Sequence, residues 1–286
     1  MALESIITNV NANIALQSLQ NTQQKLAVAE KQISTGYAVA DATDNGAAYA
    51  IAQRVRSDVG ALTSANQQLG NVQGLLSTTV SALNDVSNLM NSARDVLVKL
   101  ADGNTQGTQR TQYIQQYQSL LANVKSDLQN ADYNGTTLIG NLAGSVGSDG
   151  AVNVVTNEVG STYNIGTYSG SQLFHSINFT STQLGSATQV AALIGTSPTA
   201  ATFINQLNGI GTALNTYGSA TNYVSNQINY NSNKITALND GLGALVDANL
   251  AQESAKLQSL QIQQQLGTQA LSIANQAPSS LLSLFR

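Results

Sequence analysis

The sequence predicts a mainly α-helical fold with long antiparallel helical rods, a terminal coiled coil and a small β-rich central insertion. Apolar residues recur at alternating spacings of three and four at both ends of the chain and along much of its interior, which is the periodicity of amphipathic helices. From about residue 141 to residue 198 this periodicity gives way to short segments separated by Gly, Ser and Asp, a texture typical of strands and turns.

The first helix is predicted within the first thirty-five residues. Its apolar stripe is flanked by Asn and Gln and has no break; it consists of Ala12, Ala15, Leu19, Thr22, Leu26, Ala29 and Ile33. Ser34, Thr35 and Gly36 interrupt the pattern. Asp44 is the expected cap of the next helix, because a short acidic side chain can accept hydrogen bonds from the free amides of a helix start.

A long helix is predicted from residue 47 to residue 101, followed by a shorter one folded back on it. The turn at residues 102–104 contains a glycine, as helix ends commonly do. The stripes of the two helices consist of Val55, Val59, Leu62, Leu69, Leu76, Val80, Leu83, Met90 and Leu97, and of Ile114, Tyr117, Leu121, Val124 and Leu128. We interpret Tyr117 as core packing.

The central insertion is predicted to contain short strands. Tyr133, Asn134, Gly135 and Thr136 indicate a tight turn, and residues 151–156, 163–168 and 173–179 have the composition of strands. The insertion is expected to face outward, so that deleting residues 145–180 should still permit normal folding and assembly. Its Ser and Thr residues fit either O-linked sugars or ordinary polar loops.

A third long helix is predicted from about residue 199, leading into a carboxyl-terminal helix, with Gly241 and Gly243 at their join. In the last segment the stripe begins at Leu250, Leu257 and Leu260 and then steps sideways to Leu266, Ala270 and Ile273, as in a coiled coil with a stutter. Such a stripe needs a partner, and the amino-terminal stripe is the expected one.

Composition excludes several functions. Charged residues make up only 9% of the chain, against about 25% in average proteins, and low charge lets neighbouring subunits pack closely. The net charge is −4 without a Lys or Arg cluster, so we expect no nucleic-acid partner. No apolar run approaches the roughly 20 residues of a membrane span, so we expect no membrane insertion and, at the amino terminus, no cleavable signal.

The residue inventory also argues against catalysis. Nucleophilic and metal-dependent mechanisms need His, Cys or grouped carboxylates held close together, whereas the chain has one histidine, His175, in a predicted strand, and no cysteine. We therefore expect no enzyme activity, no cofactor and no metal site.

The two ends of the chain resemble those of bacterial flagellins. At the carboxyl end the resemblance is carried by residues 245–257, 263–267, 270–276 and 281–286. At the amino end it is carried by Thr8, Asn9, Ser34, Thr35, Gly36, Ala42, Asp44, Ala50, Ile51, Ala52, Asn134, Gly135 and Leu138. It covers roughly residues 1–140 and 205–286. The family usually has Arg-Ile where Ala38 and Val39 stand here.

The resemblance implies three domains. Residues 1–43 with 241–286 would form a terminal helical domain at the filament core, residues 44–140 with 199–240 a helical rod domain, and residues 141–198 the outward-facing variable insertion. The subunit interface would then include the terminal stripes, with Leu19, Leu26, Ile33, Leu250, Leu257, Leu260, Leu266 and Ile273.

The resemblance further implies a structural subunit of the bacterial flagellar filament that self-assembles into a helical polymer used for motility. Its partners would be copies of itself, with or without sister flagellins, together with an export chaperone and a filament cap. The protein would be secreted through the flagellar type III apparatus to the extracellular flagellum. The terminal segments would be largely disordered before assembly.

Three alternatives remain at this stage: a hook-filament junction protein, a type III secreted tip or translocator protein, and an extracellular enzyme. The first shares the terminal patterns, the second would usually show a longer apolar segment, and the third conflicts with the residue inventory.

A possible innate-receptor contact is degenerate in this sequence. Flagellins recognised by the animal Toll-like receptor for flagellin carry an Arg-x-Arg-Glu-Leu stretch, and the matching residues here begin with Ser92 in place of the first Arg. Arg94 and Asp95 fit the second half. A Glu that the family presents on the following helix is matched by Tyr117, so the resemblance implies poor recognition.

Overall fold

The computed structural model describes residues 9–140, 142–195 and 202–284. The chain divides into two compact units, one formed by Met1–Asp58 with Thr236–Arg286 and the other by Val59–Ile235. We call them unit 1 and unit 2. Unit 1 contains both chain ends, and unit 2 contains the central part of the sequence. The predicted mainly α-helical fold with a few short strands is confirmed.

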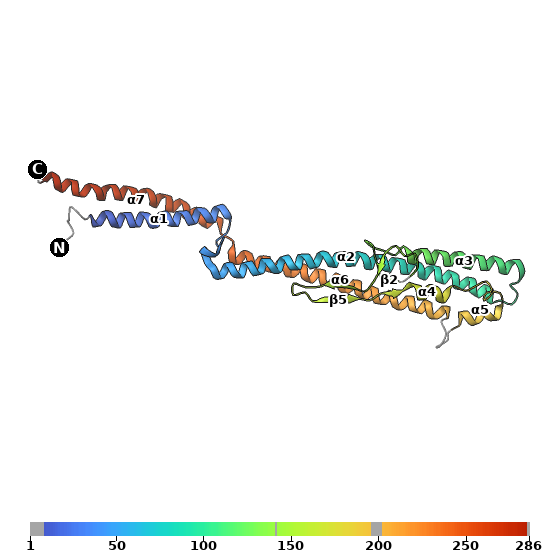
Figure 1. Ribbon diagram of the computed structural model, residues 1–286. Helices are drawn as coiled ribbons and strands as arrows, with labels where there is room; N and C mark the ends of the chain where they lie inside the picture. Colours follow the sequence, from blue (N-terminus) through green and yellow to red (C-terminus); the bar gives the residue numbers. More distant parts are fainter. Residues whose placement is uncertain (1–8, 141, 196–201, 285–286) are drawn as a thin grey trace. The chain divides into compact units, whose positions relative to one another are not determined.

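Unit 1 is built on two terminal helices that lie side by side, α1 (Val10–Thr35) and α7 (Leu250–Leu284) (Figure 1). The side chain of Asn9 caps α1 by accepting a hydrogen bond from the amide of Ala12, while its own amide donates to the Ala274 carbonyl at 2.7 Å. Gly36 ends α1 in the left-handed conformation, with φ of 76°, which glycine adopts without steric cost.

The segments that leave α1 and enter α7 are joined by backbone hydrogen bonds. Helix α6 (Phe203–Val246) ends before α7 begins, so the break falls at Asp247 rather than at the predicted glycines. The Val246 carbonyl accepts from Ala38 at 2.7 Å, and the Gly36 carbonyl accepts from Ala248 at 2.9 Å. These bonds satisfy polar groups that both helix ends would otherwise leave free.

Helix α2 (Ala42–Ala101) is interrupted near its start, so the residue that caps the long helix is not the predicted one. Asn45 has extended φ and ψ values, and its side chain accepts a hydrogen bond from the Ala48 amide at 3.1 Å. Asn45 therefore caps the long helix, and the prediction of Asp44 as that cap is wrong. The carboxylate of Asp44 accepts instead from the amides of Ala40 and Asp41 in the preceding loop.

Unit 2 is built around the long helices α2 and α6 with α3 (Gly107–Gln129) (Figure 1). Two rows on α2 are buried with a period of seven residues: Leu62, Leu69, Leu76, Leu83, Met90 and Leu97 form one, and Ala65, Val72, Thr79, Val86, Ala93 and Leu100 form the other. A strict seven-residue repeat keeps one face of a helix turned toward its neighbours, which confirms the predicted stripe.

The predicted stripe of α3 is confirmed in the same way, and α6 also buries one face. On α3 the buried residues are Tyr117, Leu121, Val124 and Leu128, and on α6 they include Phe203, Ile210, Ala213, Tyr217, Ala220 and Val224. The expected start of this helix at residue 199 lies outside the described residues. Asn231 of α6 is also fully buried, and its side-chain amide donates to Asn66 of α2 and to the Thr156 carbonyl, both at 2.9 Å.

Among the described residues, the strands of unit 2 are short and form three two-stranded sheets. β1 (Thr136–Thr137) pairs in parallel with β3 (Ser148–Asp149), and β2 (Ile139–Gly140) pairs in parallel with β6 (Tyr168–Ser169). β4 (Val152–Val155) and β5 (Thr162–Ile165) form an antiparallel hairpin. The predicted tight turn is present, with Asn134 and Gly135 at φ of 52° and 77°.

The predicted strand at residues 173–179 is wrong, because this segment begins a helix. α4 spans Gly170–Ile177, and a second short helix, α5, spans Ala187–Ile194. The Ser169 side chain caps α4 by accepting a hydrogen bond from the Gln172 amide. Leu173 and Ile177 are four residues apart and both buried, so one helical face explains the apolar composition of this segment.

The central segment also contributes to the hydrophobic core. Five side chains between residues 145 and 180 are buried among those of the long helices: Val154, Ile165, Leu173, Ile177 and Phe179. The Tyr117 hydroxyl of α3 donates to the Ile177 carbonyl at 2.6 Å. The expectation that residues 145–180 face outward is therefore wrong for these five side chains, and their burial argues against the prediction that the segment can be deleted.

One arginine near the start of α3 donates hydrogen bonds to several backbone carbonyls. The guanidinium of Arg110 donates to the carbonyls of Leu100 and Leu184, each at 2.7 Å, and to that of Thr105 at 2.9 Å. Arg110 thereby provides partners for the carboxyl end of α2, whose last carbonyls have no partner within the helix. Sequence reasoning missed this role, because a single Arg in a helical stretch carries no signal for it.

Candidate functional site

The candidate site is the pair of terminal helices, and on each helix one row of side chains is covered. On α1 the row is the predicted stripe, which is buried or half-buried throughout, whereas most other positions of α1 are exposed. On α7 the covered row consists of Glu253, Leu257, Leu260, Gln264, Gly267, Leu271 and Ala274. Both rows alternate spacings of three and four, which is the seam of an antiparallel coiled coil. We call them the inner rows.

The predicted sideways step on α7 is wrong, because the inner row continues in register. Leu250, Leu266 and Ile273 are 50%, 61% and 65% exposed. The reason is the small residue at position 267. A Cβ atom there would lie 3.2 Å from the Leu19 Cδ1 atom, so Leu19 occupies the space that a side chain at Gly267 would fill. The two helices thus pack closely at Gly267, where the sequence pattern predicts a shift of the stripe to bulkier residues.

The eight residues predicted for a subunit interface thus fall into two groups. Leu19, Leu26, Ile33, Leu257 and Leu260 lie in the inner rows and are covered within the chain, whereas Leu250, Leu266 and Ile273 do not. Sequence reasoning missed Ile262, which is also exposed. Whether any of them contacts a second subunit stays a prediction.

Replacing Gly267 is expected to separate the inner rows when the new side chain is branched. Gly267→Val would place methyl groups where Leu19 lies, so we expect it to raise the critical concentration for assembly about tenfold or more. Gly267→Ala gains roughly 1 kcal/mol of helix propensity and meets only the flexible end of Leu19, so its effect should be small. Sedimentation of assembled protein measures both.

The compensating change provides the control. Leu19→Ala in the Gly267→Val background restores the missing space, so assembly should recover relative to Gly267→Val alone. If the double variant assembles no better than Gly267→Val, the contact does not set the spacing of the two helices.

A charge cluster lies where α1 meets the loop before α2. The Lys31 ammonium group is 2.7 Å from the Asp41 carboxylate and 2.8 Å from that of Asp44. The hydrogen bond from Lys31, followed by those from Thr43, holds the pKa of Asp41 well below its usual range. Lys31 likewise lowers the pKa of Asp44, and the two carboxylates raise the pKa of Lys31.

Removing the lysine is expected to return the Asp41 pKa toward the usual value of about 3.9. A depressed carboxyl pKa adds stability above the unfolded pKa, and this is lost as the pH falls through the folded pKa. In Lys31→Met this stabilisation should therefore be smaller at neutral pH, and its loss should be complete at a higher pH than in the unmodified protein. Carboxyl titration by NMR measures the shift, and Lys25→Met on the same helix should leave it unchanged.

The possible receptor contact has its residues on two helices. Ser92, Arg94 and Asp95 are exposed on α2. Tyr117 is fully buried with its hydroxyl bonded to the Ile177 carbonyl, which confirms the prediction of core packing. Burial raises the pKa of Tyr117 far above its usual value. Tyr117 thus presents no polar group where the resemblance places a surface Glu.

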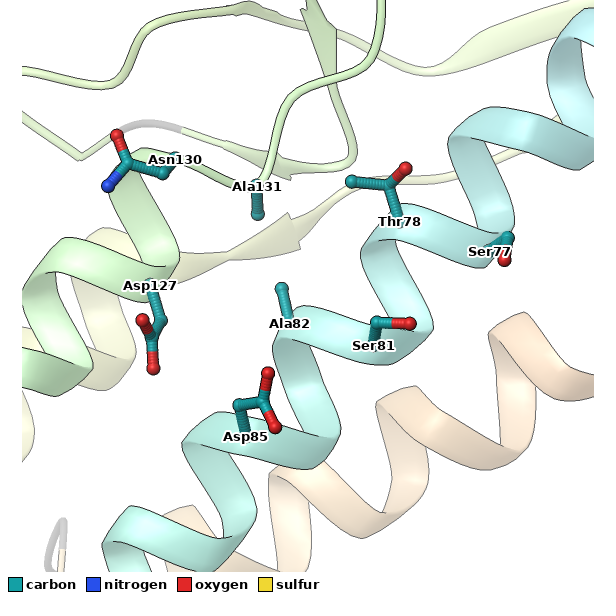
Figure 2. Close-up of a pocket in the computed structure, with 8 residues that line it drawn as sticks. All are labelled: Ser77, Thr78, Ser81, Ala82, Asp85, Asp127, Asn130 and Ala131. Atoms are coloured by element: carbon teal, nitrogen blue, oxygen red, sulfur yellow. The ribbon is translucent and has the colours of Figure 1, made fainter.

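A groove of about 390 Å³ lies between α2 and α3. Figure 2 shows Asp85 of α2 and Asp127 of α3 extending toward the same space, with Asn130 near Asp127. Burial, and then the charge of Asp85, raises the pKa of Asp127. Two carboxylates alone do not define a cation site, and no group of three or more His, Cys, Asp or Glu side chains able to hold a metal occurs among the described residues.

Two further features bear on the predicted functions. His175 lies exposed on α4, not in a strand. In the described part of the chain, every helix is too short or too polar to cross a membrane.

The fold and the site define a class of protein: helical chains whose ends pair along one face and keep apolar side chains on another, as subunits of assemblies do. Comparison with known proteins identifies the family. Residues 6–143 match the bacterial flagellin N-terminal helical region, and residues 200–285 match the bacterial flagellin C-terminal helical region.

Full-length relatives agree with these matches. Flagellin FljK of Caulobacter vibrioides is 33% identical over 287 residues, spanning 100% of both chains. A flagellin of Brucella melitensis is 34% identical over 297 residues, spanning 99% of this chain and 100% of its own. A solved structure of a putative flagellar hook-associated protein from Vibrio parahaemolyticus shares the fold, with a TM-score of 0.59 and 15% identity, over 71% of this chain and 100% of its own.

The chain belongs to the bacterial flagellin family, whose members are structural subunits of the flagellar filament. The predicted family and function are confirmed at this level.

Proposed function

We propose that the chain assembles into an extracellular flagellar filament by docking its terminal helix pair on neighbouring copies. The observation that carries the proposal is that the inner rows cover only one face of each helix. Ile14 of α1 and Leu266 of α7 remain about three-fifths exposed, at 60% and 61%. A soluble monomer gains nothing from such side chains, whereas burial among subunits releases water from them.

In this proposal unit 1 carries the assembly contacts. The contact between copies must be heterologous, because only a head-to-tail contact that does not close propagates as a helix. The predicted division, with residues 1–43 and 241–286 at the filament core, fits the presence of both chain ends in unit 1. An export chaperone and a filament cap remain proposed partners, with or without sister flagellins in the filament.

Electron microscopy of the purified protein tests the proposal directly. Long filaments that grow from added monomer support it, whereas rings or persistent monomers would favour the hook-filament junction or secreted-tip alternatives. Hydrogen exchange on the soluble monomer tests the coupling of folding to docking. We expect weak protection in residues 9–33 and 250–275 before assembly and strong protection after it. Firm protection in the free monomer would contradict that coupling.

We also propose that the animal receptor for flagellin recognises this chain poorly. Ser92 lacks the charge of the family's first Arg, and Tyr117 is buried, so the contact loses a bidentate donor and a charged partner. A receptor-reporter assay with purified monomer should give a response well below that of a recognised flagellin. A response of equal strength would refute the proposal.

A further inference from the structure

Two tyrosine rings from different elements of unit 2 stack on each other at its surface. Tyr163 lies in β5 and Tyr223 in α6; their ring centroids are 4.2 Å apart, and the ring planes are inclined by 28°. Tyr163 is half-buried and Tyr223 is 40% exposed. Aromatic pairs usually keep their centroids between about 4.5 and 7 Å apart, so these two rings are in close contact at a place that solvent reaches.

The backbone on each side of the stack is anchored in the core of unit 2. In the hairpin, Tyr163 pairs with Val154, which is 2% exposed. On α6, Val224 follows Tyr223 directly and is fully buried. Both valines belong to the same hydrophobic core. Each ring therefore extends from a segment whose position the core determines.

Hydrogen bonds also join the hairpin to α6 beside the stack (Figure 1). The side-chain amides of Gln227 and Asn231 donate to the Thr156 carbonyl at 3.1 Å and 2.9 Å. Gln227 lies about one helical turn after Tyr223, and Asn231 lies one turn further on. The rings are thus kept opposite each other by bonds in which the phenol groups take no part.

Stacked phenols can be coupled by oxidation. A one-electron oxidant takes one electron and one proton from each phenol and leaves two tyrosyl radicals. Two ring carbons ortho to the oxygens then form a carbon–carbon bond, and the protons on these carbons move to the oxygens, which restores both phenols. Hydrogen peroxide, used by a haem peroxidase, accepts the two electrons and two protons and becomes two molecules of water. Because the rings already lie together, coupling within the pair is favoured over reactions that need a diffusing partner.

The composition of the chain leaves tyrosine as its residue for cross-linking. The sequence has no cysteine, so a disulfide cannot join its segments, whereas it has ten tyrosines. In the part of the chain that the structure describes, Tyr163 and Tyr223 are the two tyrosines whose rings stack on each other.

We propose that Tyr163 and Tyr223 form an oxidative cross-linking site, at which a one-electron oxidant joins β5 to α6 through a dityrosine bond. The bond closes the segment from residue 163 to residue 223 into a covalent loop. Closing a loop restricts the unfolded chain, so the cross-linked protein unfolds at a higher temperature. The reaction needs only one copy of the chain and does not depend on the proposed assembly.

The test oxidises the full-length protein, as dilute monomer, with a haem peroxidase and hydrogen peroxide. We expect dityrosine fluorescence, a mass lower by two hydrogen atoms, and a digest in which a peptide containing Tyr163 is joined to one containing Tyr223. Tyr163→Phe and Tyr223→Phe keep both rings and remove one hydroxyl, so each should fold normally and lower the yield of the cross-link at least about tenfold.

Tyr230→Phe is the matched control. Tyr230 also lies on α6 and is 60% exposed, but among the described residues its ring has no stacked partner. The yield of the cross-link in this variant should equal that of the unmodified protein. Circular dichroism checks that all three variants are folded.

Any of three results would overturn the proposal. One is a digest in which the peptides of Tyr163 and Tyr223 are not joined. Another is an equal yield of cross-link in Tyr163→Phe. The third is coupling between chains, which is measured by mixing unlabelled copies with copies labelled with heavy nitrogen: joined peptides that carry one label each would show that the rings react with neighbouring molecules.

Thermal unfolding measures the consequence of the bond. The unmodified protein should melt at a higher temperature after oxidation than before it, whereas Tyr223→Phe treated in the same way should not change. An unchanged melting temperature in protein that carries the cross-link would overturn its stabilising role.

Discussion

Leu260→Asp is expected to abolish filament assembly while unit 2 stays folded. Leu260 is 5% exposed in the inner row of α7. A carboxylate there would be buried against α1 in place of a leucine, and moving a charge out of water in this way costs several kcal/mol, of order 3–5. The pair has few other fully buried side chains, so α1 and α7 should separate rather than bear this cost. Leu257→Asp, in the same row, should act in the same direction.

Unit 2 should be unaffected because its core contains no residue of α7. Thermal unfolding followed by circular dichroism should keep the transition of the α2, α3 and α6 core, and sedimentation should find no polymer. Gln261→Asp supplies the control, since it adds the same charge at the neighbouring exposed position. Normal filaments from Leu260→Asp, or equal loss of assembly in Gln261→Asp, would contradict a role for burial in the inner row.

The long helices of unit 2 could be predicted because each has one apolar face. On α2 the fully buried residues Leu62, Leu69 and Leu76 repeat every seven positions, and nothing on the opposite face competes with them. Periodicity then determines both the helix and the side that is buried.

Helix α7 could be predicted as a helix, but its covered side could not. Leu257 and Leu260 belong to the inner row, whereas Ile262 and Leu266 belong to a second, exposed row on the opposite side of α7. Both rows are apolar, so a single stripe drawn through the largest residues crosses from one face to the other. The inner row passes through Gln264 and Gly267, which hydrophobicity alone would not select. Only the contact between Leu19 and Gly267 reveals it.

The predictions of the short elements were wrong for local reasons. Asp44 and Asn45 are both good capping residues. Only the backbone conformation shows that Asn45 is the cap of α2. Leu173 and Ile177 occupy one face of a two-turn helix. A helix of this length is too short for its period to be distinguished from that of a strand.

Deleting residues 145–180 is expected to unfold unit 2 and so prevent assembly. The deletion removes Val154, Ile165, Leu173, Ile177 and Phe179 from the core. At about 1.5–3 kcal/mol for each buried side chain, the loss is roughly 7–15 kcal/mol, which is as large as the whole stability of a typical domain, about 5–15 kcal/mol. It also removes the Ile177 carbonyl that accepts from Tyr117 and leaves that buried hydroxyl without a partner.

A change confined to the surface of the same segment should behave differently. Val159 lies between the hairpin strands β4 and β5 and is 82% exposed, so inserting Gly and Ser after it lengthens a turn at a cost of only about 0.6 kcal/mol for each doubling of loop length. Circular dichroism and electron microscopy should find a folded, filament-forming protein with the insertion and an unfolded one with the deletion. Filaments from the deletion variant would mean that α2, α3 and α6 form a stable core without residues 145–180. Solvent or closer packing of the helices would then have taken the place of the five side chains.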